Sequence, residues 1–415
     1  RCRTLLPGPA AATAAGRQHE EEPKGRSPKH DLFHLHNHFR LVRIFPTAKE
    51  AHPSRRGNTH KWGFAPRDIP IPAGETPWRC GEKFVLLPTE RPAGRRPHGS
   101  PAAKPRTTMS FNVTILGSSS AKPTIDRHPS AQVVNVHEQY YLVDAGEGTQ
   151  QQLIRYGVNP LKLRAVFISH LHGDHLFGLF PLLSTLGLYG RRTELPVYAP
   201  APFGELLACH LRYFDTDLPY EVTWHEVRTT EHALLFENRT LEVWSIPLRH
   251  RVPTAGFLFR EKRPPLNIEK HQIVRYGLSI AQIAAAKRGE DILLDSGERI
   301  PNAELTYLPY EPRSYAYLSD TNFSAKAAGL CRGVDLMYHE ATYAAAEQKL
   351  ARERGHSTTL DAARAALKAG ARRLIIGHFS TRYKQLDELV AEARTLFPET
   401  YAAREGETFT LEKHQ

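Results

Sequence analysis

Residues 169–175 read SHLHGDH, and this run constrains the fold more than any other part of the chain. The apolar residues 165–168 before it resemble a buried strand, and residues 176–183 after it resemble the start of a helix. The polar run therefore occupies a strand-to-helix loop. It holds four side chains of the kind that bind metal ions: His170, His172, Asp174 and His175.

The spacing of these four side chains suits two ions side by side. Side chains two apart in an extended segment point the same way, so His170 and His172 can bind one ion, while the turn at Gly173 redirects Asp174 and His175. Imidazole and carboxylate ligands suit zinc, although iron or manganese is also compatible. Metal pairs about 3.5–4 Å apart recur in enzymes that split phosphoesters and related bonds. The alternative, surface histidines beside a helix-capping aspartate, does not explain why four residues of ligand type share the spacing of a known motif.

A second group of histidines, His34, His36 and His38 in HLHNHF, carries a weaker signal. It lacks an acidic partner, a preceding buried strand and a following helix pattern. We expect no functional metal site there.

Residues 1–108 differ from the rest of the chain. They contain Pro, Arg, Gly and His without helical or strand periodicity, so we expect a largely disordered extension. Met109 stands directly before the strand-like FNVTILG, which suggests that the extension is upstream sequence that has been translated. A targeting peptide is the alternative, but the acidic run 20–22 and the missing amphipathic helix disfavour it. Residues 109–415 are the expected catalytic domain.

The net charge of +11 comes from the extension alone. Residues 1–108 hold 20 of the 55 Lys and Arg residues and 9 of the 44 Asp and Glu residues, so the remaining 307 residues hold 35 of each. The total charge therefore gives no evidence that the catalytic domain binds nucleic acid, and such evidence must be local.

The cysteines and the hydropathy predict the cellular setting. Cys2, Cys80, Cys209 and Cys331 form no CxxC pair, and only the last two lie in the domain, which suits a reducing cytoplasm. No apolar span long enough to cross a membrane occurs, so we expect no membrane partner.

Within the domain, short apolar runs alternate with helical patterns. FNVTIL, AQVVNV, QYYLVDAG, LPVYAP, LEVWSIPL, AGFLFR, YAYLSD, VDLMYHE and RRLIIGHF read as strands, and TQQQLIRYG and TTLDAARAALKAG read as helices. The pattern predicts an α/β fold. His250, Asp320 and His378 each follow one of these strands, as His170 does, and sites in layered folds collect at strand ends.

Taken together, these motifs resemble the metallo-β-lactamase superfamily, and within it ribonuclease Z, the tRNA 3′-processing endonucleases. The evidence is SHLHGDH, the isolated His250, Asp320 in LSDT, His378 in GHFSTRY, GSSSAKPT, DAGEGTQQQ, HEAT at 339–342 and HST at 356–358. HxHxDH alone indicates only the superfamily, whereas HEAT followed by HST points to ribonuclease Z. The resemblance covers residues 109–415 and implies a four-layer αβ/βα sandwich with an inserted tRNA-binding arm.

The resemblance also implies roles for individual residues. One zinc ion would be bound by His170, His172 and His250, a second by Asp174, His175 and His378, and Asp320 would bridge the two ions of each subunit. A hydroxide shared by these ions would attack phosphorus. Glu340 and His356 would form the proton shuttle for the leaving 3′-oxygen, with Asp174 near the attacking water. The alternative for Glu340 and His356 is a structural ion pair.

Two regions bear on substrate recognition. Related enzymes carry a PxKxRN loop, whereas residues 123–128 here read PTIDRH, so the lysine and asparagine are absent and the response to an encoded CCA is open. Residues 260–312 are the expected arm. Its basic side chains could contact phosphates, although acidic neighbours dilute their charge: Arg260, Lys262, Arg263, Lys270, Arg275, Lys287 and Arg288.

The leading hypothesis is a zinc-dependent endoribonuclease that removes the 3′ trailer from precursor tRNA. It would leave a 3′-hydroxyl on the tRNA and a 5′-phosphate on the trailer. A binuclear enzyme acting on a small ester is the nearest alternative, and a noncatalytic RNA-binding protein is another. The resemblance also implies a homodimer, which no residue pattern in the sequence shows.

Overall fold

The computed structural model describes residues 109–214 and 217–413. The predictions for residues 1–108, including those for His34, His36 and His38, fall outside the described residues. Among the described helices, none is long and apolar enough to cross a membrane.

Two seven-stranded sheets form the centre of the domain. The first sheet has the order β18-β1-β2-β3-β4-β5-β6. Its strands are β1 (Phe111–Gly117), β2 (Ala131–Val136), β3 (Gln139–Ala145), β4 (Leu163–Phe167), β5 (Leu195–Ala199), β6 (Val222–Glu226) and β18 (Thr408–Thr410). The strands from β3 to β6 pair in parallel, as expected where helices alternate with strands.

The second sheet has the order β17-β16-β15-β14-β9-β8-β7. Its strands are β7 (Leu234–Glu237), β8 (Leu241–Pro247), β9 (Ala255–Glu261), β14 (Ser314–Leu318), β15 (Leu336–Glu340), β16 (Arg373–Gly377) and β17 (Thr400–Ala402). The strands β14, β15, β16 and β17 are parallel, so their carboxyl ends meet at one edge of the sheet.

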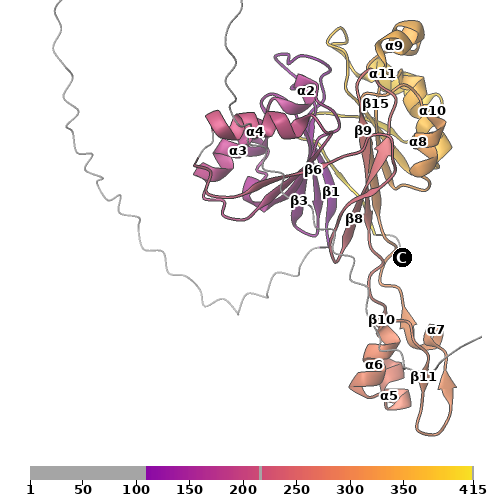
Figure 1. The fold of residues 1–415 in the computed structure, drawn as a ribbon. Helices are drawn as coiled ribbons and strands as arrows, with labels where there is room; N and C mark the ends of the chain where they lie inside the picture. Colours follow the sequence, from indigo (N-terminus) through magenta and orange to yellow (C-terminus); the bar gives the residue numbers. More distant parts are fainter. Residues whose placement is uncertain (1–108, 215–216, 414–415) are drawn as a thin grey trace, which may run out of the picture. The chain divides into compact units, whose positions relative to one another are not determined.

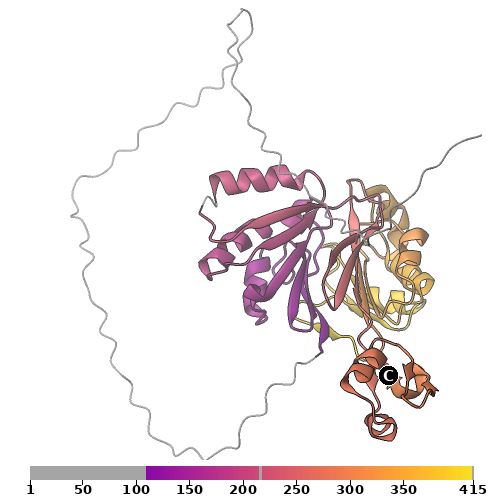
Figure 2. The same ribbon diagram turned by 60° about the horizontal axis from the view of Figure 1, so that its bottom comes forward.

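Helices cover the outer face of each sheet, which gives four layers (Figures 1 and 2). Leu153, Leu182 and Phe203 represent the core between the first sheet and its helices. The apolar residues between the two sheets and under the helices of the second sheet form one larger core. The helices of the first half are α1 (Thr149–Arg155), α2 (Gly173–Leu176), α3 (Leu179–Leu188) and α4 (Phe203–Tyr213), and those of the second are α8 (Ala325–Leu330), α9 (Gln348–Arg354), α10 (Thr359–Ala369) and α11 (Asp387–Arg394).

The predicted strands and helices are all present, with one difference in continuity. The helix expected over residues 176–183 is divided into α2 and α3 by Phe177 and Gly178. A Cβ atom at Gly178 would lie 1.9 Å from the carbonyl oxygen of Gly146, so only glycine permits this approach to the end of β3. The close contact brings the helical half of the ligand loop against the first sheet.

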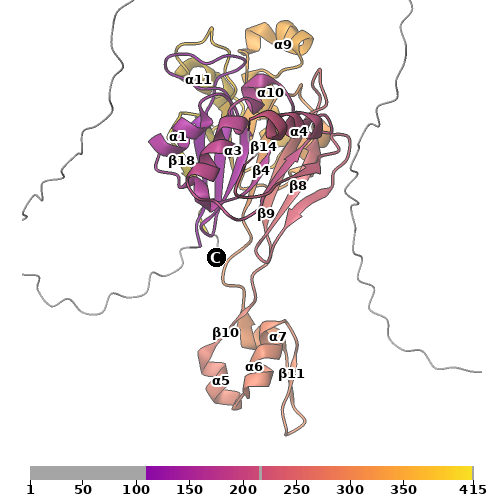
Figure 3. The same ribbon diagram turned by 60° about the vertical axis from the view of Figure 1, so that its left-hand side comes forward.

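The segment between β9 and β14 forms an arm with a small core of its own (Figures 1 and 3). Leu278, Ala286, Ile292, Ile300 and Leu305 are its buried apolar residues. Its elements are β10 (Asn267–Ile268), α5 (Lys270–Tyr276), α6 (Ile280–Lys287), β11 (Ile292–Leu293), β12 (Arg299–Ile300), α7 (Asn302–Leu305) and β13 (Thr306–Tyr307).

A buried ion pair closes the base of the arm. Arg313 donates to both carboxylate oxygens of Glu261, at 2.6 and 2.9 Å, and His137 lies 2.8 Å from the same carboxylate. Arg313 also donates to the carbonyl oxygens of Leu411 and Met109. Burial alone would raise the pKa of Glu261, but the hydrogen bonds from Arg313 and His137 outweigh it and lower the pKa to about 2.

Glu261→Gln is expected to lower the free energy of unfolding by about 3 kcal/mol, because it leaves the Arg313 charge buried without its partner. The stability contributed by ionised Glu261 is complete above pH 4.5, the ordinary pKa of this carboxyl group, and declines as the pH falls toward 2. Urea titrations at several pH values between 3 and 7 should therefore show the two proteins converging at the acidic end.

Glu237→Gln is the matched control, because Glu237 pairs with Lys262 at 2.6 Å on the surface nearby. An exposed pair contributes about 0–1 kcal/mol. An equal loss of stability in both variants would contradict the importance of burial at the base of the arm.

Candidate metal centre

All seven predicted ligands meet at one end of the two sheets. His170 and His172 follow β4, and Asp174 and His175 lie in the first turn of α2. His250, Asp320 and His378 come from the loops after β8, β14 and β16. Two groups of these side chains have their ligand atoms within 4.8 Å of one another: His170, His172, His250 and Asp320, and Asp174, His175 and His378.

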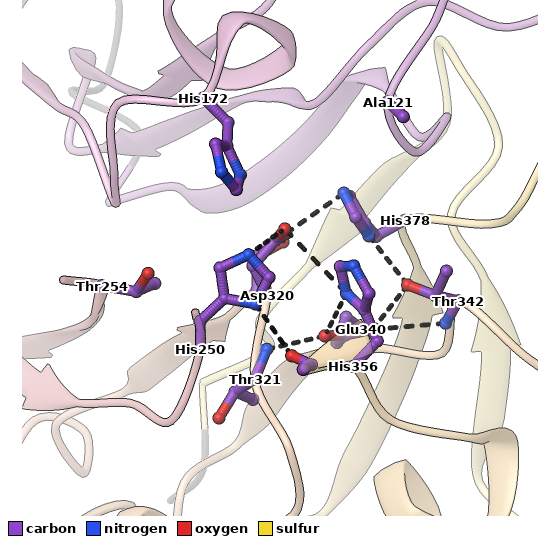
Figure 4. A network of polar contacts seen from close by, with 12 residues as sticks. Ala121, His172, His250, Thr254, Asp320, Thr321, Glu340, Thr342, His356 and His378 are labelled. Atoms are coloured by element: carbon purple, nitrogen blue, oxygen red, sulfur yellow. Dashed lines mark hydrogen bonds and ion pairs between the residues drawn. The ribbon is translucent and has the colours of Figure 1, made fainter. Parts of the chain in front are cut away.

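The first group surrounds one oxygen of Asp320. The Nε2 atoms of His170 and His250 both lie 3.6 Å from Asp320 Oδ2. His172 presents Nδ1 at 2.9 Å from His170 Nε2. Figure 4 shows His172 above Asp320 and His250 beside it.

The second group surrounds the other oxygen of Asp320. Asp320 Oδ1 lies 3.2 Å from His175 Nε2 and 3.1 Å from His378 Nε2. Asp174 Oδ2 lies 3.6 Å from each of the same two nitrogens and accepts a hydrogen bond from the Ala121 amide. Asp320 thus turns one oxygen toward each group, as a carboxylate between two ions would.

Two of these side chains sit on unusual backbone. Asp320 has φ of 51° and His378 has φ of 57°, both in the left-handed region that non-glycine residues rarely adopt. Such conformations cost about 1–3 kcal/mol each and cluster at functional sites. The left-handed backbone at both residues therefore marks this end of the sheets as a candidate functional site.

Partners outside the two groups orient the imidazole rings. Asp144 Oδ2 lies 2.7 Å from His175 Nδ1 and accepts from the Ser169 and Tyr317 hydroxyls. Thr342 Oγ1 lies 2.9 Å from His378 Nδ1. Each contact leaves Nε2 of the ring facing the centre, which is how ligand histidines are commonly held.

Asp144 was not among the predicted site residues. It is the last residue but one of the buried strand β3 and has φ of 55°, so the rule that located His250, Asp320 and His378 at strand ends applies to it as well. Its position beside His175, 31 residues later in the chain, depends on β3 and β4 being neighbours.

The donor set fits metal ions. His250 Nδ1 lies 2.8 Å from the carbonyl oxygen of Gly355, while His250 Nε2 is buried without a hydrogen-bond partner among the residues that the structure describes. An orphaned imidazole nitrogen aimed at a carboxylate is satisfied by an ion between them. Burial lowers the pKa of His170 and of His250, which favours the neutral ring that binds metals.

The carboxylates of the centre stabilise positive charge beside them. Burial alone would lower the pKa of His175, but Asp320, Asp144 and Asp174 outweigh it and raise the pKa well above its usual value. Burial would raise the pKa of Asp320, yet His378 and His175 hold it well below its usual range. A cation is stabilised here, and divalent ions supply that charge when they are bound.

Glu340 and His356, the predicted proton shuttle, lie in contact beside this centre. His356 Nδ1 is 3.0 Å from Glu340 Oε1 and 4.0 Å from Asp320 Oδ2. Burial would lower the pKa of His356, but Glu340 outweighs it and raises the pKa to about 9. Glu340 is fully buried and also accepts from the Thr321 amide and the Thr342 hydroxyl (Figure 4). The contact with Glu340 therefore favours the protonated ring and involves Nδ1, so that Nε2 of His356 takes no part in it.

A cavity of about 460 Å³ opens onto the centre. His172, Asp174, Asp320, His356 and His378 form its polar side. The rest of its lining is provided by Ser120, Ala121, Pro123, Pro129, Glu147, Gly173, Phe177 and Arg251. The segment PTIDRH at residues 123–128 contributes to the cavity through Pro123. Arg127 of the same segment instead donates a hydrogen bond to the carbonyl oxygen of Tyr383.

Two facing sheets between layers of helices, with histidines and aspartates at one edge, define the metallo-β-lactamase fold. The model of the beta-lactamase superfamily domain matches residues 139–288. Ribonuclease Z of Bacteroides thetaiotaomicron is 42% identical over 304 residues, which cover 73% of this chain and 96% of that protein. Ribonuclease Z of Cytophaga hutchinsonii is 40% identical and is covered to 96%.

Among solved structures, the short form of human tRNase Z has a TM-score of 0.53 at 26% identity, with 72% of this chain and 98% of that chain covered. The metallo-β-lactamase fold protein YhfI of Bacillus subtilis, at 19% identity and a TM-score of 0.52, shows the same fold. The chain belongs to the ribonuclease Z family of endoribonucleases.

Proposed function

We propose that this protein is a zinc-dependent endoribonuclease that removes the 3′ trailer from precursor tRNA. The tRNA product would end in a 3′-hydroxyl and the trailer would begin with a 5′-phosphate. The observation that carries the proposal is the position of Asp320 between two groups of ligand-type side chains, next to the buried Glu340–His356 pair. The relatives named ribonuclease Z and tRNase Z support the substrate.

In this proposal, His170, His172 and His250 would hold one zinc ion and Asp174, His175 and His378 would hold a second, with an oxygen of Asp320 available to each group. When bound, such a pair would activate a water for attack on phosphorus and withdraw charge from the phosphoryl oxygens. Asp174 holds and orients the water, and its own place is held by the Ala121 amide. Asp144 and Thr342 keep the ligand rings aligned.

His356 acts as the general acid. Cleavage of the bond between phosphorus and the ribose 3′-oxygen leaves an alkoxide, which takes a proton from His356 Nε2 and becomes the 3′-hydroxyl. Glu340 holds Nδ1 of the ring and stabilises its protonated form, in the same way that a carboxylate supports the imidazole in other proton relays.

The arm supplies phosphate contacts in this proposal. Arg263, Lys287 and Arg288 line a hollow of about 580 Å³ at the start of the arm. Arg288 is partly neutralised by Glu290 at 2.7 Å, whereas Arg263 and Lys287 are exposed. Exposed cations around a concave surface contact a phosphate backbone without reading its sequence.

The direction of β14 supports a homodimer in which each arm serves the partner's centre. Ser314 follows the arm at one end of β14, and Asp320 lies beyond the other end (Figures 1 and 3). The arm and the centre of one subunit therefore lie at opposite edges of the second sheet. The helices α3 and α4 and the residues directly after them expose large apolar side chains that a second copy would cover: Leu188, Tyr189, Leu206, Tyr213 and Phe214.

A complementation experiment tests this arrangement. A protein without the arm and the variant His170→Ala are each expected to be inactive on precursor tRNA, because one lacks recognition and the other lacks a ligand. Mixed subunits are expected to regain up to about a quarter of the wild-type rate, since random pairing makes half of the dimers mixed and each of these has one complete site. Failure of mixed, metal-loaded dimers to cleave would show that the arm serves its own subunit.

The first test of the function is to incubate the full chain with a 3′-extended precursor tRNA, with and without a chelator, and to map the product ends. Chelator-sensitive cleavage next to the discriminator base supports the proposal. Hydrolysis of bis(p-nitrophenyl) phosphate without cleavage of tRNA would favour an enzyme that acts on a small ester.

The free cysteines Cys209 and Cys331 agree with action in the cytoplasm.

A further inference from the structure

We propose that Phe177 is the stacking platform for the base of a nucleotide adjacent to the scissile phosphate. This inference rests on the proposed function, since it assigns a role in binding RNA to a side chain at the same cavity. It concerns the position of the substrate, and Phe177 takes no part in the chemistry.

The location of Phe177 is unusual for a phenylalanine. Its side chain is 65% exposed, although it stands between two leucines that are buried, Leu176 and Leu179. Those two leucines hold α2 and α3 against the first sheet. An exposed phenylalanine gains little from burial, so the packing of the helices does not explain an aromatic ring at this position.

The ring is nevertheless held in a defined place. A Cβ atom at Gly173 would lie 2.4, 2.7 and 2.8 Å from three atoms of the Phe177 ring, which shows that the ring rests directly on the backbone of Gly173. Gly173 lies between two metal-ligand candidates, His172 and Asp174. The ligand loop therefore supports one side of the ring and leaves the other side to the cavity and to solvent.

The surroundings of the ring suit a nucleotide. Ala121, Pro123 and Pro129 give the cavity further apolar lining, while Arg251 adds an exposed cation. A base can stack on the aromatic ring as its neighbouring phosphate contacts the cation and the scissile phosphate meets the ligand groups. Stacking tolerates every base, as a processing enzyme with many substrates requires.

The experiment compares wild type, Phe177→Ala, Phe177→Leu and Phe177→Tyr on precursor tRNAs. Phe177→Leu keeps the apolar volume without the ring, and Phe177→Tyr keeps the ring. Stacking on a protein ring contributes a factor of about 10- to 100-fold. We expect that loss in kcat/KM for the alanine and leucine variants and a loss of less than about threefold for tyrosine.

A second set of substrates separates stacking from a structural role. Each substrate lacks the base at one position: the discriminator, or the first or second trailer nucleotide. At one position, removal of the base should cost the wild-type protein about the same factor as Phe177→Ala, and the two changes together should cost little more. Metal content and the thermal midpoint of each variant identify any variant that has lost its fold.

Wild-type kcat/KM in metal-loaded Phe177→Ala, or losses that multiply at every abasic position, would overturn the inference while leaving the proposed function intact. Failure of the wild-type protein to cleave precursor tRNA at all would overturn the proposed function and this inference with it.

Discussion

Asp320→Asn is expected to lower cleavage of precursor tRNA by about 10³-fold or more and to reduce the metal content of the protein. Asp320 is the residue whose two oxygens face both ligand groups, at 3.6 Å from His170 Nε2 and at 3.1 Å from His378 Nε2. Asparagine keeps the size of the side chain but removes the charge and one acceptor. Without the negative charge of Asp320, the centre would bind a divalent ion less tightly.

The measurement is the number of zinc ions per chain, followed by kcat/KM at saturating zinc. Asp335→Asn is a matched control, because Asp335 is also a buried aspartate but accepts from Ser314 at the opposite end of β14. The control is expected to keep the metal and to remain within about twofold of wild-type activity. Full metal content and activity in Asp320→Asn would rule out a bridging role.

His356→Ala is expected to lower kcat by about 10²- to 10⁴-fold, which is the range that a positioned general acid contributes. The loss should depend on the leaving group. A thiolate leaves without needing a proton, so a precursor tRNA with sulfur in place of the bridging 3′-oxygen is expected to be cleaved by the variant almost as fast as by wild type.

Glu340→Gln tests the same proton donation through the pH dependence of activity. The glutamine amide no longer favours the protonated ring, so the pKa of His356 falls. As the pH rises, the activity of Glu340→Gln is therefore lost at a lower pH than the activity of wild type.

The zinc content of His356→Ala should stay at the wild-type value. An equal loss on the oxygen and sulfur substrates would contradict proton donation and would indicate that His356 binds metal, since it also lies near Asp320 and His378.

The position of the centre was largely predictable from the sequence because its side chains follow buried strands. Residues 165–168 are continuously apolar and read as a strand buried on both faces, which is what β4 is. Parallel strands then bring Asp320, Glu340 and His378 to one edge without any long-range signal in the sequence. The particular ligand set rested on the resemblance, and it stays a prediction that Asp320→Asn tests.

Contacts that depend on the approach of one loop to another could not be predicted from the sequence. His250 is oriented by the carbonyl oxygen of Gly355, 105 residues later, and a backbone carbonyl carries no residue-specific signal. The break between α2 and α3 depends on Gly178 meeting Gly146, two glycines whose contact requires β3 and the ligand loop to be in place. The exposure of Phe177 follows from that break, since a continuous apolar run predicts burial.

The pairing of β18 with β1 has a consequence for the order in which the first sheet is completed. The first sheet carries four of the ligand candidates, yet its edge is completed by a strand that is synthesised after every one of them. Non-local pairing of this kind forms late. A chain that ends before residue 408 would therefore hold all seven ligand candidates and still leave the outer side of β1 unpaired.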